Sequence, residues 1–303
     1  MGHLPAAAAF AATFLIPHPE MASPQLPPEI VDKVIDNLTE DETSLRSCSA
    51  ISTLWFGRSR YHLFRSLKLG TLEDLKIWFR TDSEKLEPRL RSTDYVHSLY
   101  LTDTDMGPPL FTPDVVAGLT TDLPSFPYVE SLTLDCLDLI SFDGKSLSHL
   151  FGRCSSNLTS LNITNSKIQL AQLLFLVCTF PKLENLKLDR IETTVFSAPF
   201  EAPSPTTNPT FGGKLALLNL KIRASAIVHL LVNSLSPMAF TDVSVENCDF
   251  GAPDSLNDLF IACQEKVKRI KLYSNAIYIC ELHLCGSFNN THVSSKYCIL
   301  DAS

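Results

Sequence analysis

The sequence lacks the surplus of positive charge that proteins need to bind a polyanion. Its 33 aspartate and glutamate residues outnumber 25 lysine and arginine residues, which leaves a formal net charge of −8 at pH 7. Nucleic acids attract proteins chiefly through basic patches. We therefore expect no nucleic acid among the ligands.

A long apolar run is missing as well. The most apolar N-terminal stretch, Leu4 to Ile16, is shorter than the roughly 20 residues of a transmembrane helix, and no basic segment precedes it. We expect neither a membrane anchor nor a membrane partner. The nine cysteines form no framework of close pairs, and their number is odd. This favours a reducing compartment, so the expected location is cytoplasmic or nuclear.

The sequence contains none of the common catalytic signatures. Gly144-Lys145-Ser146 resembles the end of a phosphate-binding loop, but the glycine that such a loop requires five residues before Gly144 is replaced by Leu139. The eight histidines are scattered, without a nucleophile beside them. We therefore expect no enzyme and no cofactor.

One cluster near the C-terminus has residue types that suit zinc, although its spacing follows none of the usual ligand pairs. Its members are Cys280, His283, Cys285, His292 and Cys298. The same stretch also fits a leucine repeat, Ile279 to Leu284. We expect no metal there.

What the sequence does contain is leucine in excess, 46 residues of 303, and the leucines recur in a pattern. A Leu-x-x-Leu-x-Leu kernel, with other apolar residues substituting for leucine, appears seven times. The kernels lie at Val96–Leu101, Val129–Leu134, Leu158–Ile163, Leu183–Leu188, Leu215–Leu220, Phe240–Val245 and Val267–Leu272. Their spacing is near the 20 to 29 residues typical of leucine-rich repeats.

Segments between the kernels have the periodicity of amphipathic helices. The clearest are residues 146–151, 169–178, 224–235 and 254–263, the last beginning with Asp254 as an expected cap. Alternating strands and helices of this kind stack in parallel and bury one continuous core. The expected fold class is therefore α/β, a leucine-rich-repeat solenoid over residues 96–285 with strands on the concave face and helices outside. A proline-rich loop is expected at 196–213.

The region before the kernels predicts three short helices. Pro27 and Pro28 suit a helix start, and the first helix is expected to end near Asn37. Thr39 and Glu42 fit a capping box for the second helix, and the third runs through Trp55. Together these helices have more apolar side chains than so small a module can bury, which indicates a docking surface.

These residues resemble an F-box. The matching segments are Leu26-Pro27-Pro28-Glu29-Ile30, then Leu45, Cys48-Ser49 and Trp55, and finally Arg60-Tyr61-His62-Leu63-Phe64. Followed by leucine repeats, the chain is similar to the F-box/leucine-rich-repeat proteins of fungi. The resemblance implies that the F-box binds a Skp adaptor and through it a cullin, while the repeats hold a protein substrate for a ubiquitin ligase. The Skp-binding residues are then expected to be Leu26, Pro27, Pro28, Ile30, Ile35, Leu45 and Trp55.

The expected organisation has five parts: a disordered extension at 1–23, the F-box at 24–66, a helical connector at 67–95, the solenoid at 96–285 and an irregular tail at 286–303. Side chains alternate along a strand, so residues between and just after the kernel leucines should face outward. The expected substrate face comprises Tyr100, Asp103, Asp135, Asn162, Asn165, Lys187, Asp189, Arg190, Asn219, Lys221, Glu246, Arg269, Lys271 and Tyr273, with Thr133 and Ser244 beside them. The charged residues of this face are acidic in the first two repeats, and lysine and arginine appear from the fourth repeat onward.

Two other functions remain open at this point. The chain could be an F-box scaffold that binds Skp outside any ligase. It could also be a plain leucine-rich interaction protein whose N-terminal helices only cap the repeats, and in that case it would not bind Skp.

Overall fold

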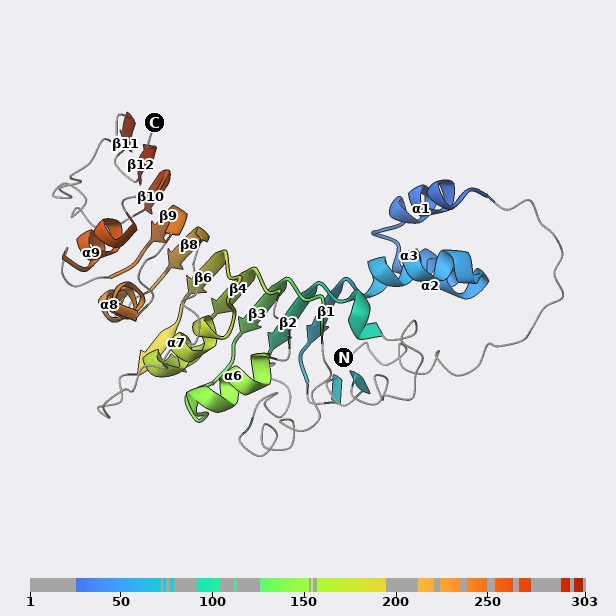
Figure 1. Ribbon diagram of the computed structural model, residues 1–303, viewed down its shortest axis with the longest axis horizontal. Helices are drawn as coiled ribbons and strands as arrows, with labels where there is room; N and C mark the ends of the chain where they lie inside the picture. The colour runs from blue at the N-terminus through green and yellow to red at the C-terminus, as the bar shows by residue number, and fades with distance from the viewer. Residues whose placement is uncertain are drawn as a thin grey trace.

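A computed structural model shows a mixed α/β protein, which confirms the expected class (Figure 1). The structure describes residues 26–71, 73–74, 77–78, 92–103, 112, 126–152, 154, 157–194, 212–220, 224–234, 239–249, 254–263, 267–273, 290–294 and 297–301. The extension at 1–23, most of the proline-rich segment and Cys280, His283 and Cys285 lie outside these ranges. Within them, no helix is both long and apolar enough to cross a bilayer.

Three helices form the N-terminal module: α1 (Pro28–Asp36), α2 (Glu42–Ile51) and α3 (Thr53–Phe64). Val31, Ile35 and Leu45 are almost fully buried and form a small core of their own. Trp55 and other partly buried side chains pack against that core. The module therefore has its own hydrophobic centre, separate from that of the sheet.

The expected capping box at the start of α2 is wrong in its details. Asp41, not Thr39, caps the helix, because its side chain accepts the N–H of Ser44 at 3.1 Å. The hydroxyl of Thr39 instead donates to the carbonyl of Asp36 at 2.6 Å, at the end of α1. Aspartate is as good a cap as threonine, and here it stands directly before the first helical residue.

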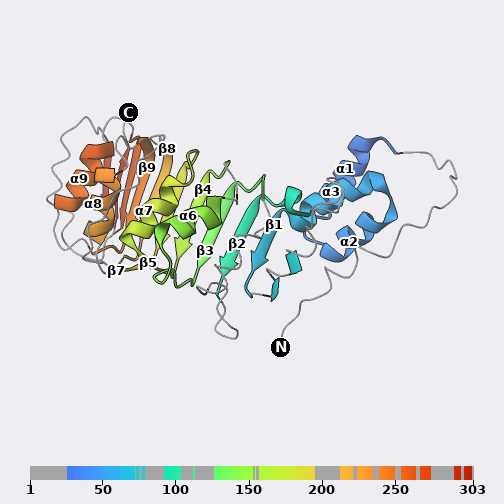
Figure 2. The same ribbon diagram turned by 60° about the horizontal axis from the view of Figure 1, so that its bottom comes forward.

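The rest of the described chain is dominated by a ten-stranded sheet in the order β1-β2-β3-β4-β6-β8-β9-β10-β12-β11 (Figures 1 and 2). Neighbouring strands from β1 to β10 are parallel. The strands are β1 (Ser66–Leu69), β2 (Ser98–Thr102), β3 (Ser131–Asp135), β4 (Ser160–Thr164), β6 (Asn185–Asp189), β8 (Gly212–Leu218), β9 (Ala239–Glu246) and β10 (Arg269–Tyr273). A separate two-stranded sheet joins β5 (Lys167–Gln169) to β7 (Glu192–Thr194).

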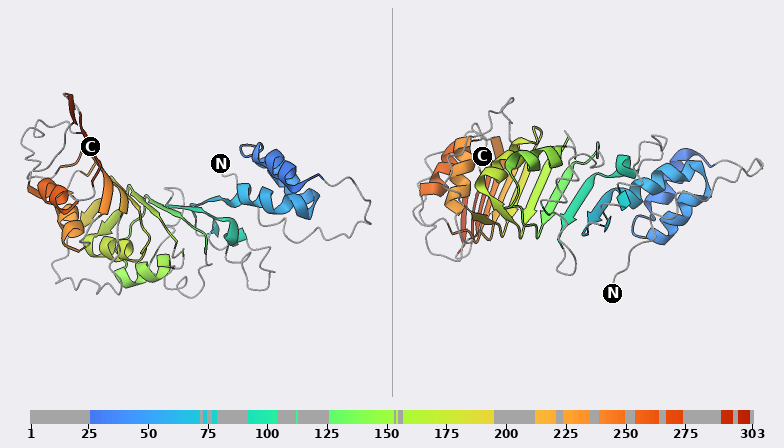
Figure 3. Two further views of the ribbon diagram at one scale, coloured as in Figure 1. Left: turned by 45° about the horizontal axis from the view of Figure 1, so that its top comes forward. Right: turned by 90° about the horizontal axis from the view of Figure 1, so that it is seen from below.

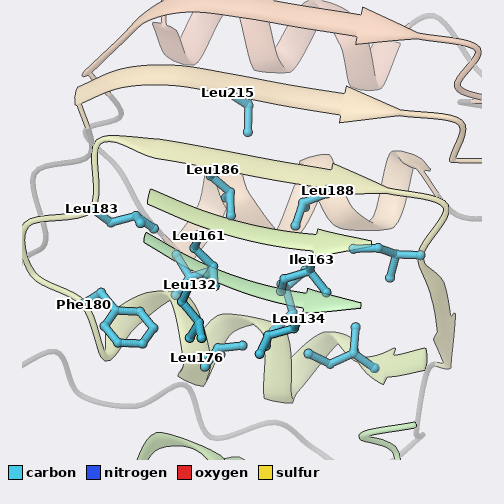
Figure 4. Close-up of a cluster of buried hydrophobic side chains, with 14 of the residues drawn as sticks. Leu132, Leu134, Leu161, Ile163, Leu176, Phe180, Leu183, Leu186, Leu188 and Leu215 are labelled. Atoms are coloured by element: carbon cyan, nitrogen blue, oxygen red, sulfur yellow. The ribbon is translucent and has the colours of Figure 1, made fainter. Parts of the chain in front are cut away.

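Four helices lie along one face of this sheet, which curves with the helices on its convex side (Figures 1 and 3). They are α6 (Gly144–Gly152), α7 (Leu170–Cys178), α8 (Ala224–Ser234) and α9 (Asp254–Cys263). Kernel side chains point toward these helices and form one continuous core with them, from Leu67 to Leu272. Figure 4 shows part of it, with Leu161 and Ile163 among leucines of the adjacent strands. The predicted alternation of buried and outward residues is confirmed in β2, β3, β4 and β6.

The connector expected at 67–95 is not wholly helical. Residues 66–69 form β1, which pairs with β2 and adds a strand before the first predicted kernel. A single residue, Arg65, separates α3 from β1, and its carbonyl accepts the N–H groups of His97 and Ser98, both at 2.9 Å. A short 3-10 helix, η3 (Ser92–Tyr95), leads into β2. The sequence does contain a kernel here, with Phe64, Leu67 and Leu69 at its apolar positions, but it overlaps Arg60–Phe64, the segment that the F-box resemblance had claimed.

The fifth kernel has a different register from the one predicted. Leu186 pairs with Leu215 and Leu215 with Val243, so the buried pair in β8 is Leu215 and Leu217. Leu218, the fourth residue of the predicted kernel Leu215–Leu220, is only partly buried and pairs with Asp189 and Glu246. Gly213, in the left-handed region at φ 93°, lies at a register shift just before this pair, and a kernel template with fixed spacing cannot anticipate such an irregularity.

In the large sheet, β3, β4, β6, β8 and β9 are each followed by a residue with positive φ. These residues are Cys136, Asn165, Arg190, Asn219 and Asn247, with φ between 50° and 57°. Asparagine tolerates this left-handed conformation better than most residues, which explains its recurrence there. We call these five positions the corners; at each of them the chain leaves its strand with the same backbone conformation.

The tail at 286–303 is not irregular, contrary to expectation. It contains β11 (Asn290–Ser294) and β12 (Tyr297–Asp301), an antiparallel pair, and β12 also pairs with β10. This hairpin covers the edge of β10, which would otherwise present unpaired backbone groups. His292 and Cys298 lie on these strands, and the proline-rich segment ends by Gly212, where β8 begins.

Candidate interaction surfaces

The first candidate surface lies on the N-terminal module and consists of exposed apolar side chains. Leu26 is 50% exposed, Ile30 44% and Val34 41%, and Ile30 and Val34 are four residues apart, on the same side of α1. Ile51, at the end of α2, and Leu54, at the start of α3, are also exposed. We call these five residues the module patch. Of the seven large apolar side chains that are exposed among the described residues, five therefore belong to this small module.

Several of the expected Skp-binding residues do not belong to the module patch. Ile35 and Leu45 are buried in the core of the module, so the expectation that they contribute to its surface is wrong. Trp55 is partly buried against the same core. Pro27 and Pro28 are exposed beside Leu26, as expected. Val34, Ile51 and Leu54 are not among the expected Skp-binding residues, although Val34 belongs to the same apolar stripe as Ile30.

A polar cluster fixes the orientation of α1 against α3. The carboxylate of Asp36 accepts hydrogen bonds from Arg58, at 2.6 and 2.8 Å, and lies 2.7 Å from Nε2 of His62. Hydrogen bonds from Arg58 and His62 lower the pKa of Asp36 from 3.8 to about 2. The folded module therefore favours the ionised carboxylate.

This shift predicts how the stability of the module depends on pH. Because the pKa is lower in the folded state, Asp36 contributes fully above about pH 4, and the contribution disappears as the pH falls to about 2. Asp36→Asn should therefore destabilise the protein at neutral pH, with the difference from wild type vanishing near pH 2. We expect a loss below about 1 kcal/mol because solvent screens a carboxylate that is 40% exposed. Urea unfolding at several pH values measures this difference, and one that does not change with pH would contradict the assignment.

The second candidate surface is the face of the sheet opposite α6 to α9, which we call the open face (Figure 3). Strand pairing aligns its outward side chains in rows that cross the strands. The middle row contains Lys68, Tyr100, Thr133, Asn162, Lys187, Ala216, Ser244 and Lys271. This row contains no acidic residue.

Asp135 organises the first half of the open face. Its carboxylate accepts hydrogen bonds from the hydroxyls of Tyr100 and Thr164, both at 2.6 Å, and from the amide of Asn165 at 2.8 Å. Burial raises the pKa of Asp135, but these hydrogen bonds outweigh the effect and leave the pKa below its usual value. In turn, the hydrogen bond to Asp135 raises the pKa of Tyr100 to about 12. Three adjacent strands are thereby tied together by one anion.

Asp189 has the corresponding place further along the sheet. It accepts a hydrogen bond from the amide of Asn219 at 3.0 Å, and Asn219 in turn accepts one from Asn247 at 3.2 Å. Arg190 and Lys187 lie 3.4 and 3.9 Å from the same carboxylate. Two cations therefore share one anion, and the local charge is positive.

The structure brings most of the expected substrate-face residues to this face or its rim. Asn162 donates to Thr133 at 3.3 Å, and Arg269 lies 3.5 Å from Asp242 of the neighbouring strand. Glu246 and Tyr273 are paired neighbours in β9 and β10, and Asp103 follows β2. Asn219 occupies a corner, not a strand position, because of the register difference in β8. Lys221 lies outside the described residues.

The open face carries no group of three or more histidine, cysteine, aspartate or glutamate side chains placed to hold a metal ion, as far as the described ranges extend. Comparison with known proteins adds no identification. No protein-family model matches the sequence, and no curated protein is detectably similar to it.

Proposed function

We propose that this protein is a substrate-recruiting, non-enzymatic subunit of a Skp–cullin–F-box ubiquitin ligase. Helices α1 to α3 act as the F-box and bind the Skp adaptor. The strand–helix units form a leucine-rich-repeat solenoid whose open face holds the protein substrate.

The observation that carries the proposal is the module patch on a helical module with its own core. Five apolar side chains remain exposed there although the module has buried Val31, Ile35 and Leu45. Exposed apolar groups of this kind are typical of a surface that a partner covers. The sequence of the module, with Leu26-Pro27-Pro28 at its start, adds the resemblance to an F-box.

The regular spacing of the strands supports the solenoid. In the observed register, the first buried residues of β2 to β10 are Leu99, Leu132, Leu161, Leu186, Leu215, Val243 and Ile270. After the first interval, these residues recur every 25 to 29 positions, within the range of leucine-rich repeats. In that repeat asparagine or cysteine stands three positions after the last leucine of the kernel. Cys248 holds this position after β9 and donates to the carbonyl of Leu217 in the neighbouring strand at 3.2 Å, whereas Leu137, Ser166, Ile191 and Leu220 hold it after β3, β4, β6 and β8.

Reconstitution with purified components tests the function and separates it from its two rivals. The protein is mixed with Skp, a cullin with its catalytic partner, and the ubiquitin-conjugating enzymes. Our proposal predicts a complex of this protein, Skp and the cullin that transfers ubiquitin to captured proteins only when this protein is present.

The two rival functions give different results in the same experiment. A scaffold outside the ligase would bind Skp but support no ubiquitin transfer. A plain interaction protein would not bind Skp at all. Either result would contradict the proposed function.

A further inference from the structure

The half of the open face formed by β6, β8, β9 and β10 is basic, although the whole protein is acidic. Its outward and corner positions carry five basic and three acidic side chains in the described strands, against a net charge of −8 for the chain. The basic residues are Lys187, Arg190, Lys214, Arg269 and Lys271, and the acidic residues are Asp189, Asp242 and Glu246. The excess negative charge therefore lies on other parts of the protein.

Two of the three acidic groups already interact with neighbouring side chains of this protein. Asp189 is only 7% exposed and is shared by Lys187, Arg190 and the amide of Asn219. Asp242 accepts a hydrogen bond from Thr241 at 3.0 Å and lies near Arg269. A partner approaching this surface thus encounters the cations first.

The lysines of the middle row are arranged at a definite spacing. Lys187 pairs with Ala216, Ala216 with Ser244 and Ser244 with Lys271, so three strand steps separate the two lysines. At about 4.8 Å a step, this corresponds to about 14 Å. Lys271 has no ion-pair partner among the residues that the structure describes. The small side chains of Ala216 and Ser244 leave room for a main chain between the two cations.

We propose that this surface binds an extended, acidic segment of a protein partner, laid across the strands from β6 to β10. An extended chain advances about 3.3 Å per residue, so two carboxylates four residues apart match the two lysines. We infer aspartate and glutamate side chains because the two lysines that match the segment stand three strands apart, whereas a phosphate group is usually held by several donors that converge on it. A concave surface with a net positive charge also attracts such a segment from a distance.

A nucleic acid is the other anionic macromolecule to consider. The net charge of −8 repels a long polyanion, and affinity for nucleic acid rests on many phosphate contacts. An acidic peptide with few charges is less affected by this repulsion. The inference rests on the proposed function only in placing the substrate on the open face.

Fluorescence anisotropy with defined peptides tests this inference. The probes are labelled peptides of about twelve residues with two glutamates four apart, with two adjacent glutamates, or with two lysines four apart. The full-length protein should bind the first most tightly and the lysine peptide least. Reversing charge with Lys187→Glu and Lys271→Glu together should weaken the first interaction at least about tenfold, which corresponds to about 1.4 kcal/mol.

A double variant with the same change in charge serves as the control. Lys167→Glu and Lys182→Glu alter exposed lysines outside the four strands of this surface and should leave peptide affinity unchanged. Circular dichroism checks that both variants fold. The inference is overturned if the charge-reversed variant binds equally well, if the lysine peptide binds best, or if a single-stranded oligonucleotide of about twelve nucleotides binds as tightly as the acidic peptide.

Skp binding by the same variants is measured in parallel. Unchanged Skp binding with lost peptide binding supports the inference. Peptide binding without any Skp binding would contradict the proposed ligase function and would still support the acidic-segment site, so failures of the two proposals are distinguishable.

Discussion

The double substitution Ile30→Asp and Leu54→Asp is expected to weaken Skp binding at least about 100-fold, which corresponds to a loss of about 2.7 kcal/mol in binding free energy. These side chains belong to the module patch and are 44% and 43% exposed, so in the free protein the new carboxylates can reach solvent. In the complex, each carboxylate would have to leave water and enter an apolar interface without a partner. Calorimetric titration of Skp into the wild type and the variant measures the loss.

The control uses an exposed isoleucine far along the chain. Ile261 on α9 is 62% exposed and lies outside the module patch, so Ile261→Asp should leave Skp affinity unchanged. Leu45→Ala serves as a control for loss of folding. It removes a core side chain, so it should lower the free energy of unfolding of the protein in the absence of Skp. Full Skp affinity in the Ile30 and Leu54 double variant would exclude the module patch as the docking surface.

The second large effect is expected at Gly213, in β8. A Cβ at this position would lie 2.5 Å from the carbonyl oxygen of Glu184, and the backbone has a φ of 93° that L-residues rarely adopt. The same carbonyl accepts the N–H of Lys214 at 2.8 Å and so cannot withdraw without losing that hydrogen bond. Gly213→Ala should therefore destabilise the protein by about 2 to 4 kcal/mol, from backbone strain and steric overlap together.

Gly57→Ala is the matched control for this substitution. Gly57 lies inside α3, and a Cβ there would meet no atom within 4 Å. Alanine favours a helix more than glycine does, so a gain of about 0.5 to 1 kcal/mol is expected. Urea unfolding compares the two variants, and a Gly213→Ala protein as stable as wild type would contradict the observed backbone of β8.

Sequence patterns predicted the parts of the fold that depend on local alternation. Kernel leucines such as Leu132 and Leu134 are separated by one outward residue, and a strand with one buried face requires this arrangement. The helices at 169–178, 224–235 and 254–263 were found nearly residue for residue because each shows a helical apolar period. The α/β class follows from these two periodicities together.

Other parts depend on contacts that no local pattern encodes. The hairpin of β11 and β12 joins the sheet by antiparallel pairing of β12 with β10, and its sequence contains no leucine kernel from which that pairing could be predicted. In β8, leucine occurs at four of six positions from Leu215 to Leu220, and several registers therefore fit equally well. Ile35 and Leu45 show the same difficulty on helices, because an apolar side chain can serve a small core or a partner surface. Only the packing of the three helices decides between them.

Hydrogen–deuterium exchange of the unmodified protein, with and without Skp, tests the central claim most directly. The module patch as a Skp-docking surface predicts slower exchange on Skp addition in α1 and around the junction of α2 and α3. Exchange in the strands from β2 to β10 should not change, because the proposal assigns Skp to the module patch and not to the open face. Protection confined to the sheet, or no protection anywhere at saturating Skp, would contradict the account.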